Sequence, residues 1–408
     1  MKTFDLCKEY CIGCGLCKSE LHADMKKNAK GFWFPNLQNN EKTERFLEHV
    51  CPIADNCLNE QNIDIWGPYI HAYAGYSTDV SIRKKASSGG VLTGIALYLL
   101  ESGKVDGIIQ VTADKENPVE TVVQVSTTAE QVLACCGSRY SISSPWLHLS
   151  ECMEPGKTYA AIGKPCDIRA VRRLQAYNDS YQPIKYLLSF FCAGLPSKDA
   201  NAKLLATLGC KEKACKSLTY RGNGWPGTVT AIDEEKNTYQ MEYSQAWGGI
   251  LGRDIHPYCR ICFDGIGECA DIACGDGWYM DVQGNPDFTE HPGRNVIFSR
   301  TQIGEELLRE AKENEKISLS DWENIGALRK IQNYQYTRKA TMRAKKLAYR
   351  ILLRKFPEYD KSLLKNYATM VPVKKTYENF PWNSKEDCSK ANLKGTMEQY
   401  EQNEKEYS

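Results

Sequence analysis

Three cysteines near the N-terminus, spaced Cys11-x-x-Cys14-x-x-Cys17, carry the clearest chemical signal in the chain. A tight loop with this spacing lets three thiolates reach three corners of one 4Fe–4S cube, and a remote Cys-Pro supplies the fourth thiolate. Cys51-Pro52 provides that remote cysteine. The spacing therefore predicts one 4Fe–4S cluster on Cys11, Cys14, Cys17 and Cys51.

Two alternatives to this ligand set stay open. Three close cysteines and one remote cysteine also form zinc knuckles, although the triple spacing with Cys-Pro favours iron–sulfur. Leu21 stands where a local run would place its fourth cysteine, and Cys7 or Cys57 could replace Cys51. A second run of this type does not occur nearby, so we expect one cluster in this segment rather than two.

Four further cysteines stand at turns expected in the middle of the chain. Cys166 follows a short apolar strand, Cys192 ends another, and Cys259 and Cys262 form a Cys-x-x-Cys pair. Together they could supply four thiolates to a second 4Fe–4S cluster assembled from distant segments. Spacing alone favours a simpler interpretation, in which Cys166 and Cys192 are buried thiols and the pair binds zinc or is redox-active.

The elements that must position these cysteines alternate between apolar strands and helices. A helix is expected over 91–100, because the turn at 87–90 precedes a mostly apolar run and Gly103 follows it. A second helix is expected over 168–174, and strands are expected over 68–77, 105–111, 159–163, 184–191 and 270–276. This alternation predicts an α/β domain around a largely buried sheet.

Composition places these elements in a long, nearly neutral chain. It has 408 residues, 18 cysteines and a formal net charge of +1, which fits two or three domains and does not suit a nucleic-acid partner. No run approaches about 18 consecutive apolar residues, which argues against a transmembrane helix. The N-terminus lacks the apolar core of a signal peptide, so we expect a cytoplasmic protein with reduced, metal-binding thiols.

A strongly basic segment follows the expected α/β domain. Between Ala327 and Phe356 there are ten Lys or Arg residues and no Asp or Glu. The apolar residues there suit an amphipathic helix with a solvated basic face. An anionic substrate, an acidic redox partner such as ferredoxin, or peripheral membrane contact through residues 327–356 would also use these charges. From Lys385 onward the polar sequence predicts poor order.

An ordered series of short motifs runs from about residue 70 to about residue 310. The motifs are Ser87-Ser88-Gly89-Gly90-Val91-Leu92-Thr93, Gly137-Ser138-Arg139-Tyr140-Ser141, Gly163-Lys164-Pro165-Cys166, Phe191-Cys192-Ala193-Gly194, Cys259-Arg260-Ile261-Cys262 and Ala270-Asp271-Ile272-Ala273-Cys274-Gly275-Asp276. This series resembles the beta-subunit family of coenzyme F420 hydrogenase/dehydrogenase, which also includes 7-hydroxymethyl chlorophyll a reductase.

The resemblance implies a particular fold and ligand set. It implies an α/β (α+β overall) chain with a ferredoxin-type module at 1–65, an FAD-binding catalytic domain at 66–315, and a basic helical segment with a polar tail at 316–408. It also implies a second 4Fe–4S cluster, with Cys166, Cys192, Cys259 and Cys262 as its ligands. Cys269 and Cys274 stand near the last pair and could replace a ligand.

The resemblance also implies a path for electrons. They would enter from ferredoxin, another low-potential donor or a reduced deazaflavin, and pass through both clusters and FAD to an unknown small organic or anionic substrate. The basic tail resembles that of members associated with cell-surface polysaccharide genes, which implies a role in that biosynthesis. The alternative is a non-catalytic electron-transfer subunit of a larger redox complex.

Several residues of the motifs are expected to contact the flavin. The turn Ser87-Ser88-Gly89-Gly90 ends at a helix N-terminus, where free N–H groups favour a phosphate, although such turns are more often plain helix caps. The other candidates are Arg139, Tyr140 and Ser141 for the flavin or a substrate anion, Lys164 as a cation beside reduced flavin, and Asp276 in the flavin wall.

One apparent motif and one histidine are assigned no cofactor. The segment Gly222-Asn223-Gly224-Trp225-Pro226-Gly227 formally matches the G-x-G-x-x-G dinucleotide fingerprint. Trp225 and Pro226 stand where the helix would begin, so we expect a loop over the active site or a plain turn instead. His256, three residues before Cys259, is expected to be structural.

Overall fold

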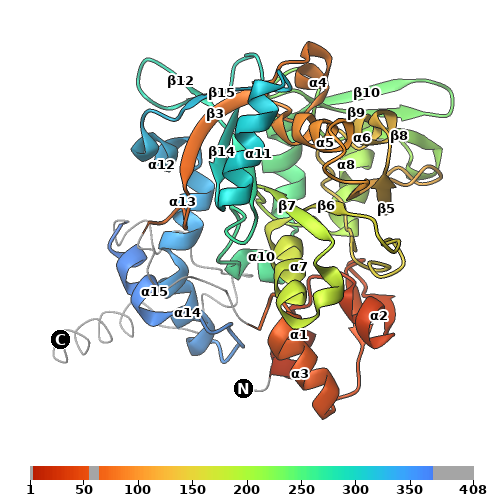
Figure 1. The fold of residues 1–408 in the computed structure, drawn as a ribbon, viewed down its shortest axis with the longest axis vertical. Coiled ribbons are helices and arrows are strands. Elements are labelled where there is room, and N and C mark those ends of the chain that lie inside the picture. Colours follow the sequence, from red (N-terminus) through yellow and green to blue (C-terminus); the bar gives the residue numbers. More distant parts are fainter. Residues whose placement is uncertain (1–2, 55–63, 371–408) are drawn as a thin grey trace.

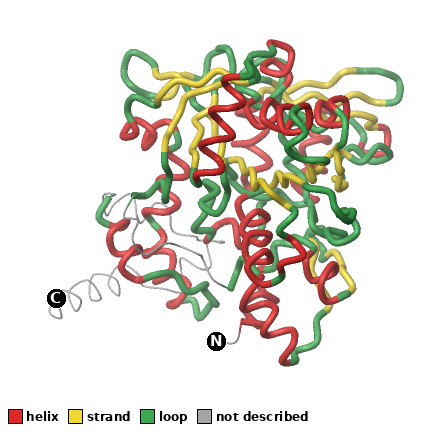
Figure 2. The backbone as a smooth tube through the Cα atoms, viewed as in Figure 1, coloured by secondary structure: helices red, strands yellow, loops and turns green. Residues whose placement is uncertain are grey.

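The computed structural model describes residues 3–54 and 64–370. Its central feature is an eight-stranded mixed sheet (Figures 1 and 2), which confirms the α/β class. The strand order is β15-β3-β14-β11-β7-β6-β4-β5. The strands are β3 His71–Ser77, β4 Gly107–Ala113, β5 Thr121–Ser126, β6 Tyr159–Gly163, β7 Ile184–Phe190, β11 Ile272–Asp276, β14 Asn295–Ser299 and β15 Ile317–Asp321.

Parallel strands form the middle of this sheet. The neighbours β4, β6, β7 and β11 run parallel, and antiparallel strands flank them on both sides. Successive residues of one strand enter different cores: Ile108 belongs to one apolar cluster and Ile109 to another. Because side chains alternate across a strand, both faces of the sheet are covered. The strand expected over 159–163 is confirmed with its bounds.

Helices cover the two faces of the sheet. Side chains of α5 and α11 pack together in one cluster, whereas α7 packs on the opposite face with the N-terminal helices α1 and α3. The helices are α1 Thr3–Tyr10, α2 Leu16–Leu21, α3 Glu41–Val50, α4 Val80–Lys85, α5 Val91–Glu101, α6 Ala129–Ala134, α7 Pro165–Tyr177, α8 Lys198–Leu208, α9 Tyr243–Gln245, α10 Pro257–Ile261, α11 Gln302–Glu313, α12 Leu328–Ile331, α13 Asn333–Ala340, α14 Met342–Ile351 and α15 Lys361–Ala368.

Smaller sheets extend the domain. Strands β8 Cys215–Thr219, β9 Thr228–Asp233 and β10 Thr238–Glu242 form an antiparallel sheet that packs on α8. β1 Asp24–Lys27 pairs with β2 Trp33–Asn36, and β12 Tyr279–Met280 with β13 Pro286–Asp287. The apparent dinucleotide fingerprint leads into strand β9 rather than a helix, as its Trp-Pro pair suggested.

The basic C-terminal segment differs from the expected single amphipathic helix. Within residues 327–356 the chain forms three helices, α12, α13 and α14, separated by breaks near residues 332 and 341. Arg338, Lys339 and Lys345 are buried, and Lys339 forms a salt bridge of 2.5 Å with Glu268. The expectation that these charges face solvent is wrong for the three buried cations, because the number of charges alone does not reveal inward-facing acidic or thiol partners.

Residues from all three predicted domains share one apolar core. Phe46 of α3, Ile168 of α7 and Tyr336 of α13 belong to the same buried cluster. The domain boundaries therefore stay a prediction. Within the described residues, none of the helices has the length and apolar character required to cross a bilayer. Cys57 and the polar tail from residue 371 lie outside the described residues.

Candidate functional site

The first cysteine set converges in the structure. Cys11 and Cys14 lie on the loop before α2, Cys17 lies in α2, and Cys51 directly follows α3. Burial raises the pKa of Cys17 well above its ordinary value, and the thiolates of Cys11, Cys14 and Cys51 add to this rise. Burial and Cys51 likewise raise the pKa of Cys11 to about 12. Four neighbouring thiols that repel each other's charge fit a bound metal cluster, which takes up that charge.

Two backbone features hold the loop that carries Cys11 and Cys14 in place. Gly15 has a φ of 100°, and a Cβ atom there would lie 2.4 Å from the backbone nitrogen of Leu147. The backbone nitrogen of Trp146 donates a hydrogen bond of 2.9 Å to the carbonyl oxygen of Cys14. The loop therefore docks against the main domain, and glycine is required by the close approach of another backbone segment.

Cys7 lies beside the proposed fourth ligand. A hydrogen bond from the Cys7 thiol lowers the pKa of Cys51, and that of Cys7 is raised by the same contact and by burial. The structure thus brings both cysteines named as the fourth ligand, Cys51 and its substitute Cys7, to one place. Cys57, the other substitute, lies outside the described residues.

The second cysteine set lines one small cavity. Cys166 is the second residue of α7, Cys192 follows β7, Cys259 lies in α10 and Cys262 follows α10. All four contribute to the cavity wall, together with Ile12 and Arg338. Burial raises the pKa of Cys166 well above its ordinary value, and Cys192 and Cys262 add to the rise. Segments that are far apart in sequence therefore present four thiols to one space.

Across residues 3–54 and 64–370, no group of three or more His, Cys, Asp or Glu side chains is placed to hold a single metal ion. The same described ranges contain sixteen cysteines, none of them in a disulfide.

Helix α7 connects the two cysteine sets. Cys166 begins the helix, and three residues later Arg169 forms a salt bridge of 2.9 Å with the buried carboxylate of Asp264. Arg169 also donates a hydrogen bond of 3.4 Å to the carbonyl oxygen of Pro52, next to Cys51. Residues three or four apart share one helix face, so one face of α7 supports both sites.

The two sites also touch directly through the N-terminal loop. Ile12, between Cys11 and Cys14, lines the cavity of the second set. The His256 ring interacts with the backbone of Cys11, and its Nδ1 accepts a hydrogen bond of 3.2 Å from the backbone nitrogen of Tyr258. Burial lowers the pKa of His256 to about 4, so the ring is neutral at pH 7 and links the two loops.

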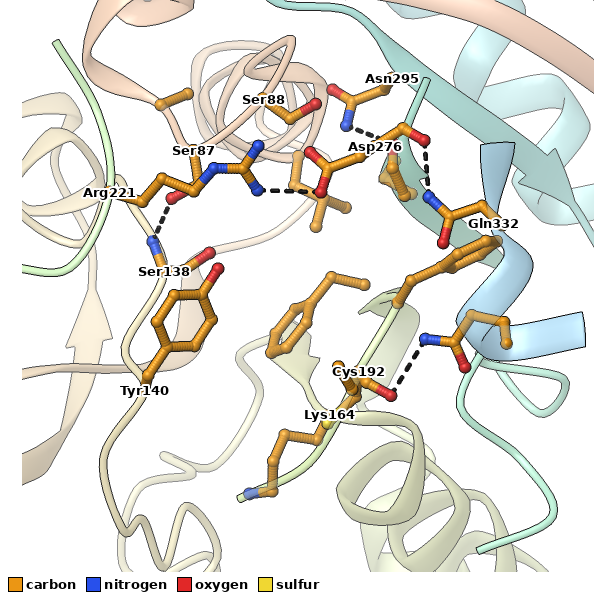
Figure 3. A pocket seen from close by; sticks show the side chains of 18 of the residues that line it. Ser87, Ser88, Ser138, Tyr140, Lys164, Cys192, Arg221, Asp276, Asn295 and Gln332 are labelled. Carbon is orange, nitrogen blue, oxygen red and sulfur yellow. Dashed lines mark hydrogen bonds and ion pairs between the residues drawn. The ribbon is translucent and has the colours of Figure 1, made fainter. Parts of the chain in front are cut away.

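A large cavity of about 890 Å³ adjoins the second cysteine set (Figure 3). The two cavities share Lys164 and Cys192 in their walls. Two ion pairs line it: Lys164 with Asp167 at 2.6 Å, and Arg221 with Asp276 at 2.9 Å. The remaining charged lining residues are three cations, Arg139, Arg329 and Lys330. A cavity of this size with a cationic excess suits an elongated anionic ligand.

The expected flavin residues fall into two groups. Those that line the large cavity are Ser87, Ser88, Gly90, Arg139, Tyr140, Lys164 and Asp276. Gly89 and Ser141 do not line it. The Ser141 hydroxyl donates to the carbonyl oxygen of Val119, and a Cβ atom on Gly89 would lie 2.7 Å from Oδ1 of Asn295.

Arg139 lines the cavity, but backbone carbonyls occupy its guanidinium. It donates to Leu218 at 2.9 Å, to Glu120 at 3.2 Å and to Pro118. Its charge remains available to an anion, whereas most of its hydrogen-bonding capacity is used in the fold. Lys164 is similarly engaged, because Nζ contacts Asp167 and donates 2.9 Å to the Ser143 hydroxyl.

Other lining residues were not selected from the sequence. The backbone nitrogen of Ser138 donates 2.7 Å to Oγ of Ser87 (Figure 3), and Oδ1 of Asn295 accepts 3.3 Å from the first backbone nitrogen of α5. Gln332 donates 2.6 Å to the carbonyl oxygen of Asp276. These contacts join distant segments, so local spacing carries no signal for them. The run of basic residues pointed to the region around Gln332, but it did not indicate that Gln332 contributes to the cavity wall.

Comparison with known proteins agrees with this architecture. The family model for the N-terminal part of the coenzyme F420 hydrogenase/dehydrogenase beta subunit matches residues 72–150, and that for its C terminus matches residues 156–325. The chain therefore belongs to the coenzyme F420 hydrogenase/dehydrogenase beta-subunit family, as the ordered motifs indicated. Helices α12–α15 lie beyond the matched residues.

Individual relatives are similar over most of the matched region. The coenzyme F420 hydrogenase subunit beta of Methanosarcina barkeri is 28% identical over 260 residues, which is 60% of this chain and 79% of the relative. The coenzyme F420-dependent sulfite reductase of Methanocaldococcus jannaschii is 27% identical over 297 residues, 69% of this chain and 42% of the relative. These relatives are redox enzymes or their subunits, which places the chain among oxidoreductase and electron-transfer proteins.

A solved structure shares the fold. A chain of the F420-reducing NiFe hydrogenase complex from Methanosarcina barkeri superimposes with a TM-score of 0.54 at 24% identity, covering 70% of this chain and 95% of that chain. The similarity supports the mixed α/β architecture.

Proposed function

We propose that this chain is an electron-transfer subunit of a larger redox complex, with two 4Fe–4S clusters and one FAD. The observation that carries the proposal is the continuity of three spaces. Ile12 separates the first cysteine set from the second, and Lys164 and Cys192 belong to the walls of both the second cavity and the large cavity. An uninterrupted series of redox sites is what electron transfer requires.

The residues of each space fit the group proposed for it. Cys11, Cys14, Cys17 and Cys51 would hold the first cluster, and Cys166, Cys192, Cys259 and Cys262 the second. The turn at Ser87 and Ser88, the N-terminus of α5 and the surplus of cations suit the pyrophosphate of FAD. When bound, iron–sulfur clusters transfer single electrons, and a flavin exchanges one or two electrons.

Ion pairs and aromatic side chains of the chain determine the charge and shape of the large cavity. The Lys164–Asp167 pair keeps a cation at the boundary between the two cavities without adding net charge. The Arg221–Asp276 pair likewise adds no net charge to the wall of the large cavity, where Arg221 is 2% exposed. Trp278 lines the cavity and stacks on Trp225 with ring centroids 4.3 Å apart, which gives one wall a rigid aromatic surface.

The printed functions of the relatives favour the subunit role. The Methanosarcina barkeri relative is a hydrogenase subunit, so a partner protein there completes the enzyme. The alternative given in the sequence analysis is therefore better supported than a self-sufficient enzyme with its own organic substrate. Ferredoxin as the donor, a role in polysaccharide biosynthesis and membrane contact stay predictions. The sixteen cysteines of the described residues, none of them in a disulfide, suit the reducing cytoplasm.

An electron-transfer assay with a protein donor tests the proposal. Reduced ferredoxin, which is too large to enter the cavity, is mixed anaerobically with the purified chain and oxidised coenzyme F420, the coenzyme in the names of the relatives. We expect coenzyme reduction by the wild-type chain and loss of it in Cys14→Ser and Cys259→Ser. Cys152→Ser, which changes a thiol outside both sets, serves as the matched control and should retain the rate.

The outcomes separate the relay from its rivals. Wild-type rates in both cluster variants would contradict the relay, because electrons would then bypass both cysteine sets. If ferredoxin fails and a small viologen dye succeeds, with the same dependence on Cys259, the relay holds and its partner is another protein. A chain without bound flavin that transfers no electrons to the coenzyme would contradict the flavin part of the proposal.

A further inference from the structure

A buried arginine from beyond the family-matched region lies at the second cysteine set. Arg338, on α13, is 5% exposed and lines the small cavity together with Cys166, Cys192, Cys259 and Cys262. Its Nη2 donates a hydrogen bond of 3.1 Å to the carbonyl oxygen of Cys192. The matched family region ends at residue 325, so the cation enters the site from a separate segment.

Arg338 has a different kind of partner from the other cations around this cavity. Lys164 is paired with Asp167, and Arg169 is paired with Asp264. Arg338 instead donates to two neutral acceptors, the Cys192 carbonyl and the Gln335 amide oxygen. Among the described residues no carboxylate forms a salt bridge with it, and its Nε has no hydrogen-bond partner. The positive charge of Arg338 thus lies beside the cysteines, and no salt bridge within the described residues balances it.

The guanidinium of Arg338 and the four thiols belong to the wall of one small cavity. Arg338 is 5% exposed, so little water screens its charge there. A buried cation in this position favours negative charge on the sulfur ligands.

The backbone opposite Arg338 is adapted to its position. A Cβ atom on Gly265 would lie 1.1 Å from Nη2 of Arg338. The Gly265 carbonyl oxygen accepts a hydrogen bond of 2.8 Å from the backbone nitrogen of Cys192, so the same glycine holds the loop of a ligand. Any larger residue at 265 would have to displace the guanidinium from the cavity wall.

We propose that Arg338 is a positioning and charge-balancing residue that raises the reduction potential of the second cluster. The inference rests on the proposed function, because it requires a cluster on the second cysteine set. Adding one electron makes a thiolate-bound cluster more negative, and a buried cation beside its ligands stabilises the reduced form. The C-terminal helices thereby set how readily the second site accepts an electron from its neighbour.

Spectroscopic redox titration tests this role independently of activity. The second cluster is identified as the electron paramagnetic resonance signal that Cys259→Ser removes. Its midpoint potential is then compared among wild type, Arg338→Gln, Arg338→Lys and the control Arg350→Gln, which removes an exposed charge from α14. Gly265→Ala provides a second route, because it displaces the guanidinium and leaves residue 338 unchanged.

We expect Arg338→Gln and Gly265→Ala to make reduction at least tenfold less favourable, a fall of about 59 mV for a one-electron couple. Arg338→Lys and Arg350→Gln should stay near wild type. An unchanged potential in Arg338→Gln, or an equal fall in the lysine variant, would overturn the inference. Loss of the second cluster in both Arg338 variants would also overturn it, because the guanidinium would then serve assembly. A wild-type chain without the second signal would instead refute the proposed function.

Discussion

The two cysteine sets are built in opposite ways. The first takes three of its four thiols from one seven-residue stretch, Cys11 to Cys17, and its loop is shaped by left-handed glycines. The second takes its thiols from three separate segments, which α7, the end of β7 and α10 bring together. A local loop needs only a docking surface, whereas a dispersed site needs the whole domain to be folded. The first set therefore depends on backbone conformation and the second on packing and buried charge.

The largest expected effect comes from removing a ligand of the dispersed set. Cys259→Ser should lose about four of about eight iron atoms per chain, since one four-iron cluster cannot form. Iron analysis of anaerobically purified protein measures this loss, with Cys152→Ser as the control. Unchanged iron would show that the second cysteine set holds no cluster.

A paired substitution sharpens the ligand assignment of the local set. Cys51→Ser should lose the first cluster, whereas Cys7→Ser should keep it and alter only its spectrum, since Cys7 donates to the Cys51 sulfur. Iron content and electron paramagnetic resonance of both variants provide the readout. The reverse result, iron lost with Cys7 and kept without Cys51, would make Cys7 the fourth ligand.

Arg169 of α7 connects the two cysteine sets, so replacing it should have a large effect on the stability of the fold. Arg169→Gln removes the salt-bridge partner of the buried Asp264 carboxylate and should destabilise the fold by about 3–5 kcal/mol. Arg309→Gln breaks an exposed salt bridge of 2.9 Å with Glu313 and should cost about 0.5 kcal/mol. Denaturant unfolding measures both. Equal effects would indicate that α7 does not carry the connection between the sites.

A further stability effect concerns the backbone of the local loop. Gly103→Ala, at a φ of 67° with nothing within 4 Å of the added Cβ, should cost about 1–2 kcal/mol from left-handed strain alone. Gly15→Ala adds a contact of 2.4 Å with the backbone of Leu147 and should cost more than its control. Thermal unfolding compares the two variants. A smaller loss of stability in Gly15→Ala than in Gly103→Ala would contradict tight docking of the loop that carries Cys11 and Cys14.

The same contrast explains what could be predicted from the sequence. The local ligand run, the strand at 159–163 and the helix beginning at Val91 are encoded by neighbouring residues, so spacing and apolar pattern indicate them. The second set became visible only through the order of family motifs, because no local spacing relates Cys166 to Cys259. Residues such as Asn295 and Arg338 join segments far apart in the chain and carry no local signal.

The basic segment shows a further limit of prediction from sequence. Its ten charges predicted an outward-facing helix, but Lys339 pairs with Glu268 and Arg338 faces the thiols. Whether a cation points inward depends on acidic and thiol groups more than 60 residues away in the chain. Amino-acid composition gives the number of charges, whereas the packing of the folded chain determines which group each charge contacts.

The proposed function requires one chain to assemble a local and a dispersed cluster site beside a flavin cavity. The iron, zinc and flavin contents of the anaerobically purified wild-type chain provide the decisive test. We expect about eight iron atoms and one FAD per chain with no stoichiometric zinc. About four iron atoms, or zinc in place of iron, would contradict it.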